Sequence, residues 1–171
     1  MTRDQQKSGS DFQQWVKPLL PQSAAYAYAI VRSREDAEDA VQEAAIKAYQ
    51  AFATYNPCCP FKGWWLAILR NCCRDLLRRR QSRPATVAME RIELPSKAAW
   101  PTDLYRELQE ALDQLSEEHR EILQLRYFGG CSYREIADIL NIPAGTVMSR
   151  LYAARRVLTD IYREDLHYEA H

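Results

Sequence analysis

Apolar side chains recur every three or four positions along several stretches of this 171-residue chain, and no stretch alternates clearly between apolar and polar residues. This spacing gathers the apolar residues on one face of an α-helix, whereas a half-buried strand needs a period of two. The chain has only five glycines and is rich in alanine, leucine, glutamate and arginine, which favour helices. The sequence therefore predicts an all-α fold.

The stretch 33–52 has the most regular helical pattern. Ser33 is followed three residues later by Asp36, which is the arrangement of a capping box that opens a helix. One face of this helix is acidic, and we expect the other to be buried. The apolar positions of the buried face are Ala37, Ala40, Val41, Ala44, Ala45, Ala48, Tyr49 and Phe52.

Prolines divide the rest of the chain. Pro18 and Pro21 kink or split a helical stretch over 11–31, and the turn at 56–60 precedes a helix over 61–80. Three prolines and the lack of a sustained period make 83–102 a predicted flexible linker. We therefore expect two small helical domains, 8–82 and 103–165, joined by the linker 83–102.

The second half has the proportions of a helix-turn-helix. Ser116 caps a helix that ends at the glycine pair 129–130, and Ser132 opens a short helix through a second capping box. Residues 141–143 form a turn, with Pro143 suited to the first turn of the last helix. A plain helical hairpin with surface arginines is the alternative.

The charge of the chain is zero in total but uneven along the sequence. Residues 61–83 hold seven Lys and Arg against one Asp, and 144–158 hold three arginines and no carboxylate. Two separate cationic surfaces suit a two-point contact with a polyanion such as DNA, although each alone could be a solvated surface. In the last helix, Thr146, Ser149 and Arg150 lie near the N-terminal end, which we expect to face DNA away from the apolar positions.

Four segments together resemble bacterial extracytoplasmic-function (ECF) sigma factors. They are 36–43 (DAEDAVQE), 61–71 (FKGWWLAILRN), 133–137 (YREIA) and 142–151 (IPAGTVMSRL). The resemblance covers roughly 11–165. It implies a helical region 2, a linker and a helical region 4 in a promoter-specificity subunit of RNA polymerase. Its implied partners are core RNA polymerase, promoter DNA and, as for many relatives, an anti-sigma factor.

The resemblance also implies three sets of binding residues. The acidic face of 33–52 is similar to the surface that docks on the polymerase's largest subunit. The residues of this face are Asp36, Glu38, Asp39, Gln42 and Glu43. A face that is only solvated is the alternative. The basic segment resembles the part that opens the −10 element, and Asn71 lies at the family's specificity-loop position. The implied −10 contacts are Arg70, Asn71, Arg74, Arg78, Arg79 and Arg80. The set for the −35 element is Arg134, Thr146, Ser149, Arg150 and Arg155.

Four residues qualify that resemblance. Trp64 is expected to be core rather than a stacking platform for bases, and Trp65, where the family usually has leucine, is expected to be more exposed. Met148 and Ala153 occupy positions where the family often carries Lys or Arg. Two usual cationic contacts are therefore missing, so the promoter sequence cannot be transferred from relatives.

The five cysteines form two adjacent pairs and one single residue: Cys58, Cys59, Cys72, Cys73 and Cys131. Adjacent cysteines chelate zinc poorly, so we expect no metal, and we expect Cys72 and Cys73 to pack inward as small apolar groups. The alternative is that their oxidation beside Asn71, or a disulfide to Cys58 or Cys59, blocks opening of the −10 element. Scattered histidines and the lack of a phosphate-binding loop predict no catalysis and no cofactor.

Two other functions remain open at this point. One is a self-sufficient helix-turn-helix repressor or activator that binds a symmetric operator as a dimer. The other is a thiol sensor or small redox enzyme. No apolar run approaches the ~18 residues of a membrane span and no secretion signal is recognisable, so we expect a cytoplasmic protein without membrane insertion.

Overall fold

A computed structural model describes residues 11–81 and 102–168, which belong to two compact units. Within these ranges the chain is made of helices and short connections, with no strand. The predicted all-α fold is confirmed. The predicted linker lies outside the described residues, except for Thr102, where a helix begins. None of the described helices combines the length and the apolar character needed to cross a bilayer.

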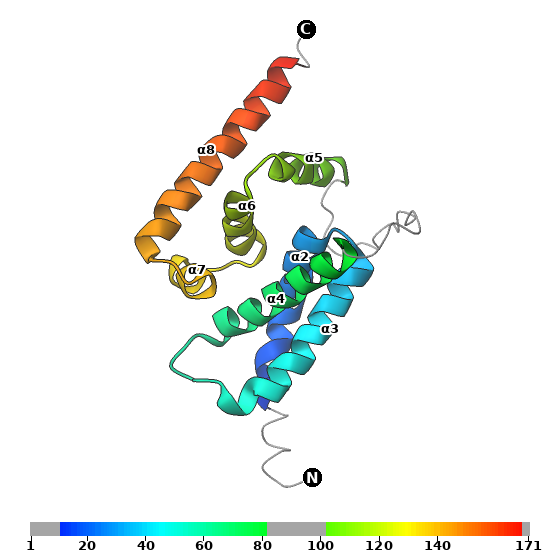
Figure 1. The fold of residues 1–171 in the computed structure, drawn as a ribbon, viewed down its shortest axis with the longest axis vertical. Helices are drawn as coiled ribbons and strands as arrows, with labels where there is room; N and C mark the ends of the chain where they lie inside the picture. The colour runs from blue at the N-terminus through cyan, green and yellow to red at the C-terminus, as the bar shows by residue number, and fades with distance from the viewer. Residues whose placement is uncertain (1–10, 82–101, 169–171) are drawn as a thin grey trace. The chain divides into compact units, whose positions relative to one another are not determined.

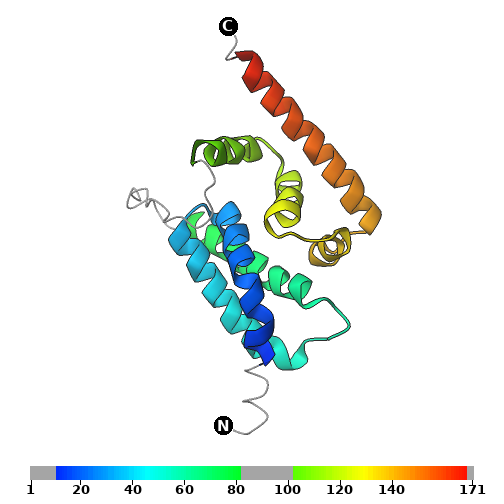
Figure 2. The ribbon, with the colours of Figure 1, turned by 180° about the vertical axis from the view of Figure 1, so that it is seen from behind.

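The first unit is built from three helices that pack against one another, α2 (Leu20–Val31), α3 (Arg34–Ala51) and α4 (Phe61–Gln81) (Figure 1; seen from behind in Figure 2). Residues 11–16 are also helical, and the 3₁₀ turn η1 (Lys17–Leu19) joins them to α2, so the prolines do split this stretch. A second 3₁₀ turn, η2 (Phe52–Thr54), follows α3.

Small side chains fill the contact between these helices. Ala40, Ala44 and Ala48 of α3 and Ala27 of α2 are fully buried, which lets the helix backbones approach closely. Val41 and Ala45 are only partly covered and Tyr49 is exposed, so the buried face of α3 is narrower than predicted.

Trp65 is the largest fully buried side chain of this unit, and the expectation that it is more exposed than Trp64 is wrong. Its indole Nε1 donates to Ser23 Oγ at 2.7 Å, and that hydroxyl donates to the Leu19 carbonyl at 2.7 Å. Neighbouring residues of a helix point about 100° apart, so only one tryptophan can face the core centre. Trp64 is half-buried, with its ring centroid 4.9 Å from that of Tyr55.

The second unit contains α5 (Thr102–Asp113), α6 (Glu117–Leu123), the π-helical turn η3 (Gln124–Phe128), α7 (Tyr133–Leu140) and α8 (Ala144–Tyr168). α6, α7 and α5 each contact α8. Ser116 and Ser132 cap α6 and α7 as predicted, and at Ser132 both hydrogen bonds of the capping box are present.

The glycine pair ends η3 for steric reasons. A Cβ on Gly129 would lie 2.8 Å from the Leu125 carbonyl oxygen, and Gly130 has φ 57°, in the left-handed region. Asn141, also left-handed with φ 52°, ends α7. Pro143 directly precedes α8 rather than lying in its first turn, and its carbonyl accepts from Val147 N at 3.1 Å.

Candidate polymerase and DNA interfaces

The acidic face of α3 begins at the helix N-terminus. Ser33 Oγ accepts from Asp36 N at 3.3 Å, as predicted for the cap, but the Asp36 carboxylate is paired with Arg80 of α4. Glu38, Asp39 and Gln42 are exposed, and Glu38 accepts from Arg34 Nε at 2.7 Å within the same helix. These three residues therefore present polar groups to solvent.

Charged side chains tie α3 to α4. Besides the Arg80–Asp36 pair, Arg79 Nη2 lies 3.6 Å from Glu43 Oε1, and Lys47 Nζ lies 2.8 Å from the same oxygen. The hydrogen bond from Lys47 holds the pKa of Glu43 below its ordinary value. Two of the five acidic-face residues assigned to the polymerase, Asp36 and Glu43, are thus paired with α4, and two of the arginines assigned to DNA are their partners.

Ile46 extends this face and was missed by the sequence reasoning. Its side chain is 60% exposed, one helical turn beyond Gln42. The sequence contains a signal for this residue, because an isoleucine among Gln42, Glu43 and Lys47 interrupts the polar pattern of the face. An exposed apolar side chain beside carboxylates is a common feature of protein-binding surfaces.

The helix predicted over 61–80 is confirmed, and Asn71 lies within it rather than in the loop that its resemblance to the family's specificity-loop position implied. Asn71 is exposed but lies well inside α4, because no proline or glycine interrupts the sequence from 64 to 81. Arg70 and Arg74 are half-exposed, and Arg78, Arg79 and Arg80 are exposed in the last turn. Cations in the last turn complement the helix dipole, and Arg78 also lies 3.7 Å from Asp75.

The loop of the first unit lies at 55–60 instead. Asn56 Oδ1 accepts from Cys58 N at 3.0 Å, and the Tyr55 hydroxyl donates to the Cys59 carbonyl. Burial raises the pKa of Tyr55 above its ordinary value. Both cysteines are exposed, so this loop presents two thiols to solvent.

Aromatic rings pack beside this loop. Phe61 is in edge contact with Trp15 and Tyr55, with ring centroids 5.3 Å and 5.6 Å away. Trp15 remains 41% exposed. The sequence analysis missed this grouping of aromatic rings beside a loop, because the rings come from three separate segments.

Cys72 and Cys73 are buried in α4, so the interpretation of these residues as core is confirmed. Burial raises the pKa of both thiols, that of Cys73 to about 12. All five cysteines are free, and Cys131 is buried in the second unit. In the described ranges, no three His, Cys, Asp or Glu side chains are grouped as metal ligands.

Burial predicts a large contrast in thiol reactivity. At pH 8 and under native conditions, we expect Cys58 and Cys59 to react rapidly with a maleimide. Cys72, Cys73 and Cys131 should react at least about tenfold more slowly, because the thiolate is the reactive form and these three groups are enclosed. Peptide mass spectrometry over time measures this, with labelling in urea as the control. Fast native labelling of Cys73 would contradict the buried placement.

The second unit places α7 and α8 as a helix-turn-helix. Val147, Leu151 and Ala154 of α8 are fully buried, so the opposite side of the helix is free to meet another molecule. Ser149 is exposed on that side, and its hydroxyl donates to the Thr146 carbonyl at 3.1 Å. Arg134 of α7 and Arg155 of α8 are also exposed.

Arg150 does not lie on the outer face, contrary to expectation. It follows Val147 by three residues, which places it only about 60° away around the helix. Its side chain is 24% exposed, and Nη2 lies 3.2 Å from Glu118 Oε2 of α6. Arg150 therefore lies at the edge of the outer face and joins α8 to α6.

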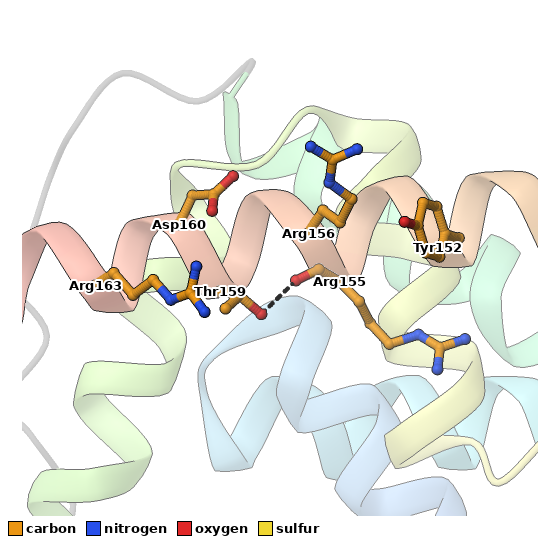
Figure 3. Close-up of a pocket in the computed structure, with 6 residues that line it drawn as sticks. All are labelled: Tyr152, Arg155, Arg156, Thr159, Asp160 and Arg163. Carbon is orange, nitrogen blue, oxygen red and sulfur yellow. Dashed lines mark hydrogen bonds between the residues drawn. The ribbon is translucent and has the colours of Figure 1, made fainter.

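An open cleft runs along the outer side of α8 (Figure 3). Arg156 points to one side of the helix and Arg155 to the other, and the Arg156 guanidinium lies 6.0 Å from the Tyr152 ring centroid. The cluster is predominantly cationic and thus suited to phosphate. The residues that line the cleft are Tyr152, Arg155, Arg156, Thr159, Asp160 and Arg163.

These features define a class of protein. A short helix, a left-handed turn residue and a long helix with a cationic outer side form a DNA-binding helix-turn-helix. It is joined in sequence to a helical unit with an exposed acidic face and a basic helix end. The class is a two-part helical DNA-binding protein.

Comparison with known proteins identifies the family. The sigma-70 region 2 family matches residues 15–83, and the sigma-70 region 4 family matches 105–158. The Pseudomonas aeruginosa RNA polymerase sigma-H factor is 32% identical over 142 residues, which is 75% of this chain and 74% of that protein. The Escherichia coli ECF RNA polymerase sigma-E factor is 31% identical over 137 residues, 72% of each chain.

A solved structure agrees with these sequence relatives. The sigma factor RpoE, solved in complex with the anti-sigma factor NepR from Bartonella quintana, has a TM-score of 0.73 and 29% identity. The match covers 90% of this chain and 97% of that one. This chain belongs to the ECF group of the sigma-70 family. It is a transcription initiation factor that directs core RNA polymerase to promoters, and it is not an enzyme.

Proposed function

We propose that residues 8–82 form the region 2 domain and that this domain binds core polymerase and the −10 element. Residues 103–165 form the region 4 domain, which binds the −35 element, and residues 83–102 link the two. The observation that carries the proposal is the separation of charge over the described surface. α3 presents exposed acidic groups, whereas the end of α4 and the outer side of α8 present arginines. Acids suit a protein partner with basic groups, and arginines suit DNA phosphates.

The polymerase surface consists of Glu38, Asp39 and Gln42, together with Ile46. Their common exposure on α3 supports this assignment. Asp36 and Glu43 border the same surface while holding Arg80 and Arg79. They fix the position of α3 against α4 and contribute to docking through the negative potential of the face.

The −10 contacts are Asn71 and the arginines of α4, which supply an amide for a base and cations for the backbone of a melted strand. Arg79 and Arg80 serve here after exchanging a carboxylate for a phosphate. The Arg79–Glu43 pair is largely exposed, and exposed ion pairs contribute only about 0–1 kcal/mol, so that exchange costs little. The Asp36 side chain is only 16% exposed, so the release of Arg80 costs more.

The −35 contacts include Arg134, Thr146, Ser149 and Arg155 on the helix-turn-helix, with Arg150 at the edge of that surface.

Arg150→Ala should weaken promoter binding by about 1–3 kcal/mol if the guanidinium contacts a base, and the loss should then depend on the identity of a single base pair. If it contacts a phosphate, the loss should be uniform across sequences with a shallower salt dependence. Filter binding of the polymerase complex over a salt series measures both.

Glu118→Ala is the matched control for Arg150→Ala, because it breaks the same ion pair but leaves the cation in place. Promoter binding by the Glu118 variant should be unchanged or tighter. Equal losses in the two variants would mean that Arg150 only joins α8 to α6, and would count against its role in DNA binding.

The test of the whole proposal is transcription in vitro with purified core polymerase on a genomic library. Promoter-dependent transcripts that need both units are expected. Tight binding to a symmetric operator without polymerase would instead support a free-standing regulator.

The proposed function also implies that the protein acts in the cytoplasm. The complex of the Bartonella relative with an anti-sigma factor supports an anti-sigma partner for this chain as well.

A further inference from the structure

Two apolar side chains stand on the outer side of α8, where a polar surface would be expected. Met148 is 58% exposed and Tyr152 is 63% exposed. They are four residues apart, so they lie next to each other along one side of the helix. Neither fills the core, since Val147, Leu151 and Ala154 already occupy the buried side.

Arg156 continues the same row one turn further on, with its guanidinium 6.0 Å from the Tyr152 ring. Met148 and Arg156 are eight residues apart, which is about 12 Å along a helix. The major groove of B-DNA is also about 12 Å wide. The edge of the groove is therefore about 6 Å from its middle. If Met148 lies over the base edges at the middle, Arg156 lies beyond the edge, where its guanidinium can contact phosphates.

The chemistry of Met148 then limits which base it can meet. Recognition helices contact base edges with residues near their N-terminus, and Met148 is the fifth residue of α8. A thioether cannot donate to guanine or accept well from adenine or cytosine. The apolar group that base edges offer in the major groove is the C5 methyl of thymine.

We propose that Met148, supported by Tyr152, recognises a thymine methyl group in the −35 element. The inference rests on the proposed function and goes further, because it assigns the specificity of one position. The row is apolar at the base-edge end and cationic at the phosphate end, and this order matches the surface of a DNA groove. A protein partner would also cover exposed methionine and tyrosine, and the experiment below separates the two.

The experiment removes a single methyl group from the DNA. The full chain is combined with core polymerase, and −35 sequences are selected from randomised DNA. Each thymine of a selected element is then replaced by deoxyuridine, which pairs identically but lacks the C5 methyl. At one or two positions we expect binding to weaken about fourfold, the effect of losing one buried methyl group.

Met148→Ala should bind the thymine and uracil elements equally, within about 1.5-fold, at the affinity of the wild-type protein for uracil. Met148→Leu should keep the discrimination, because an apolar side chain of similar size remains. Val157→Ala is the matched control, since Val157 is an exposed apolar residue of α8 on another side of the helix, and it should behave as wild type.

The outcomes distinguish the two levels of the proposal. If the wild-type complex selects no −35 element, the proposed function fails. If it selects one but binds thymine and uracil alike at every position, the inference fails while the function stands. If Met148→Ala weakens both DNAs by the same factor, or changes only the binding of a protein partner, Met148 contacts something other than the methyl group and the inference is overturned.

Discussion

Replacing Asp39 by lysine should weaken the binding of core RNA polymerase at least tenfold, which is about 1.4 kcal/mol. Asp39 is exposed on α3 between Glu38 and Gln42. If the polymerase meets this face with basic groups, a lysine there places like charges together, which costs up to several kcal/mol. The fold should be unaffected, because changes at exposed positions usually alter the free energy of unfolding by less than about 0.5 kcal/mol.

Asp39 is a better choice than Glu43 for this test. A lysine at position 43 would face Lys47 and Arg79, so its effect on the domain would be mixed with its effect on docking. Asp11→Lys supplies the control, since it makes the same charge change at an exposed position of the same unit outside α3. Fluorescence titration against core polymerase should give wild-type affinity for Asp11→Lys. If Asp39→Lys also bound core polymerase with wild-type affinity, α3 would not carry the docking surface.

Helix ends were predictable because their chemistry is local. The caps at Ser33, Ser116 and Ser132 each use a hydrogen bond between residues three apart, so the pattern is complete within one short segment. Asn141 likewise ends α7 through its own left-handed backbone. Such features need no knowledge of the partner helix.

Pairings between helices were not predictable. The resemblance to a family assigned Asp36 to a protein partner and Arg80 to DNA, but the packing of α3 on α4 brings the two together. The helical pattern placed Arg150 on the outer face, but in the structure its guanidinium pairs with Glu118 of α6. The resemblance to a family placed Asn71 near a loop, whereas the unbroken helical pattern of 61–81 was the better guide. Charge patterns identify candidate contacts, and tertiary structure decides which are used internally.

Replacing Trp65 by alanine should cost about 3–5 kcal/mol of unfolding free energy, the usual loss for a fully buried aromatic side chain. A domain has a total stability of only about 5–15 kcal/mol, so this loss removes a large share of it and should lower the urea concentration at the unfolding midpoint. Ser23→Ala should cost about 1–3 kcal/mol, because it leaves the indole N–H buried without its partner at 2.7 Å. Urea unfolding followed by circular dichroism measures both.

Trp64→Ala decides whether burial or residue type sets these losses. Trp64 is half-buried among Tyr55 and Phe61, where its removal lets solvent in rather than leaving an empty cavity. Its loss should be less than half that of Trp65→Ala. The choice between the two tryptophans depends on Ser23, which lies 42 residues earlier and accepts from only one of them. If Trp64→Ala lost more unfolding free energy than Trp65→Ala, Trp64 would be the core residue. In that case α4 would be rotated by about 100° about its axis relative to α2.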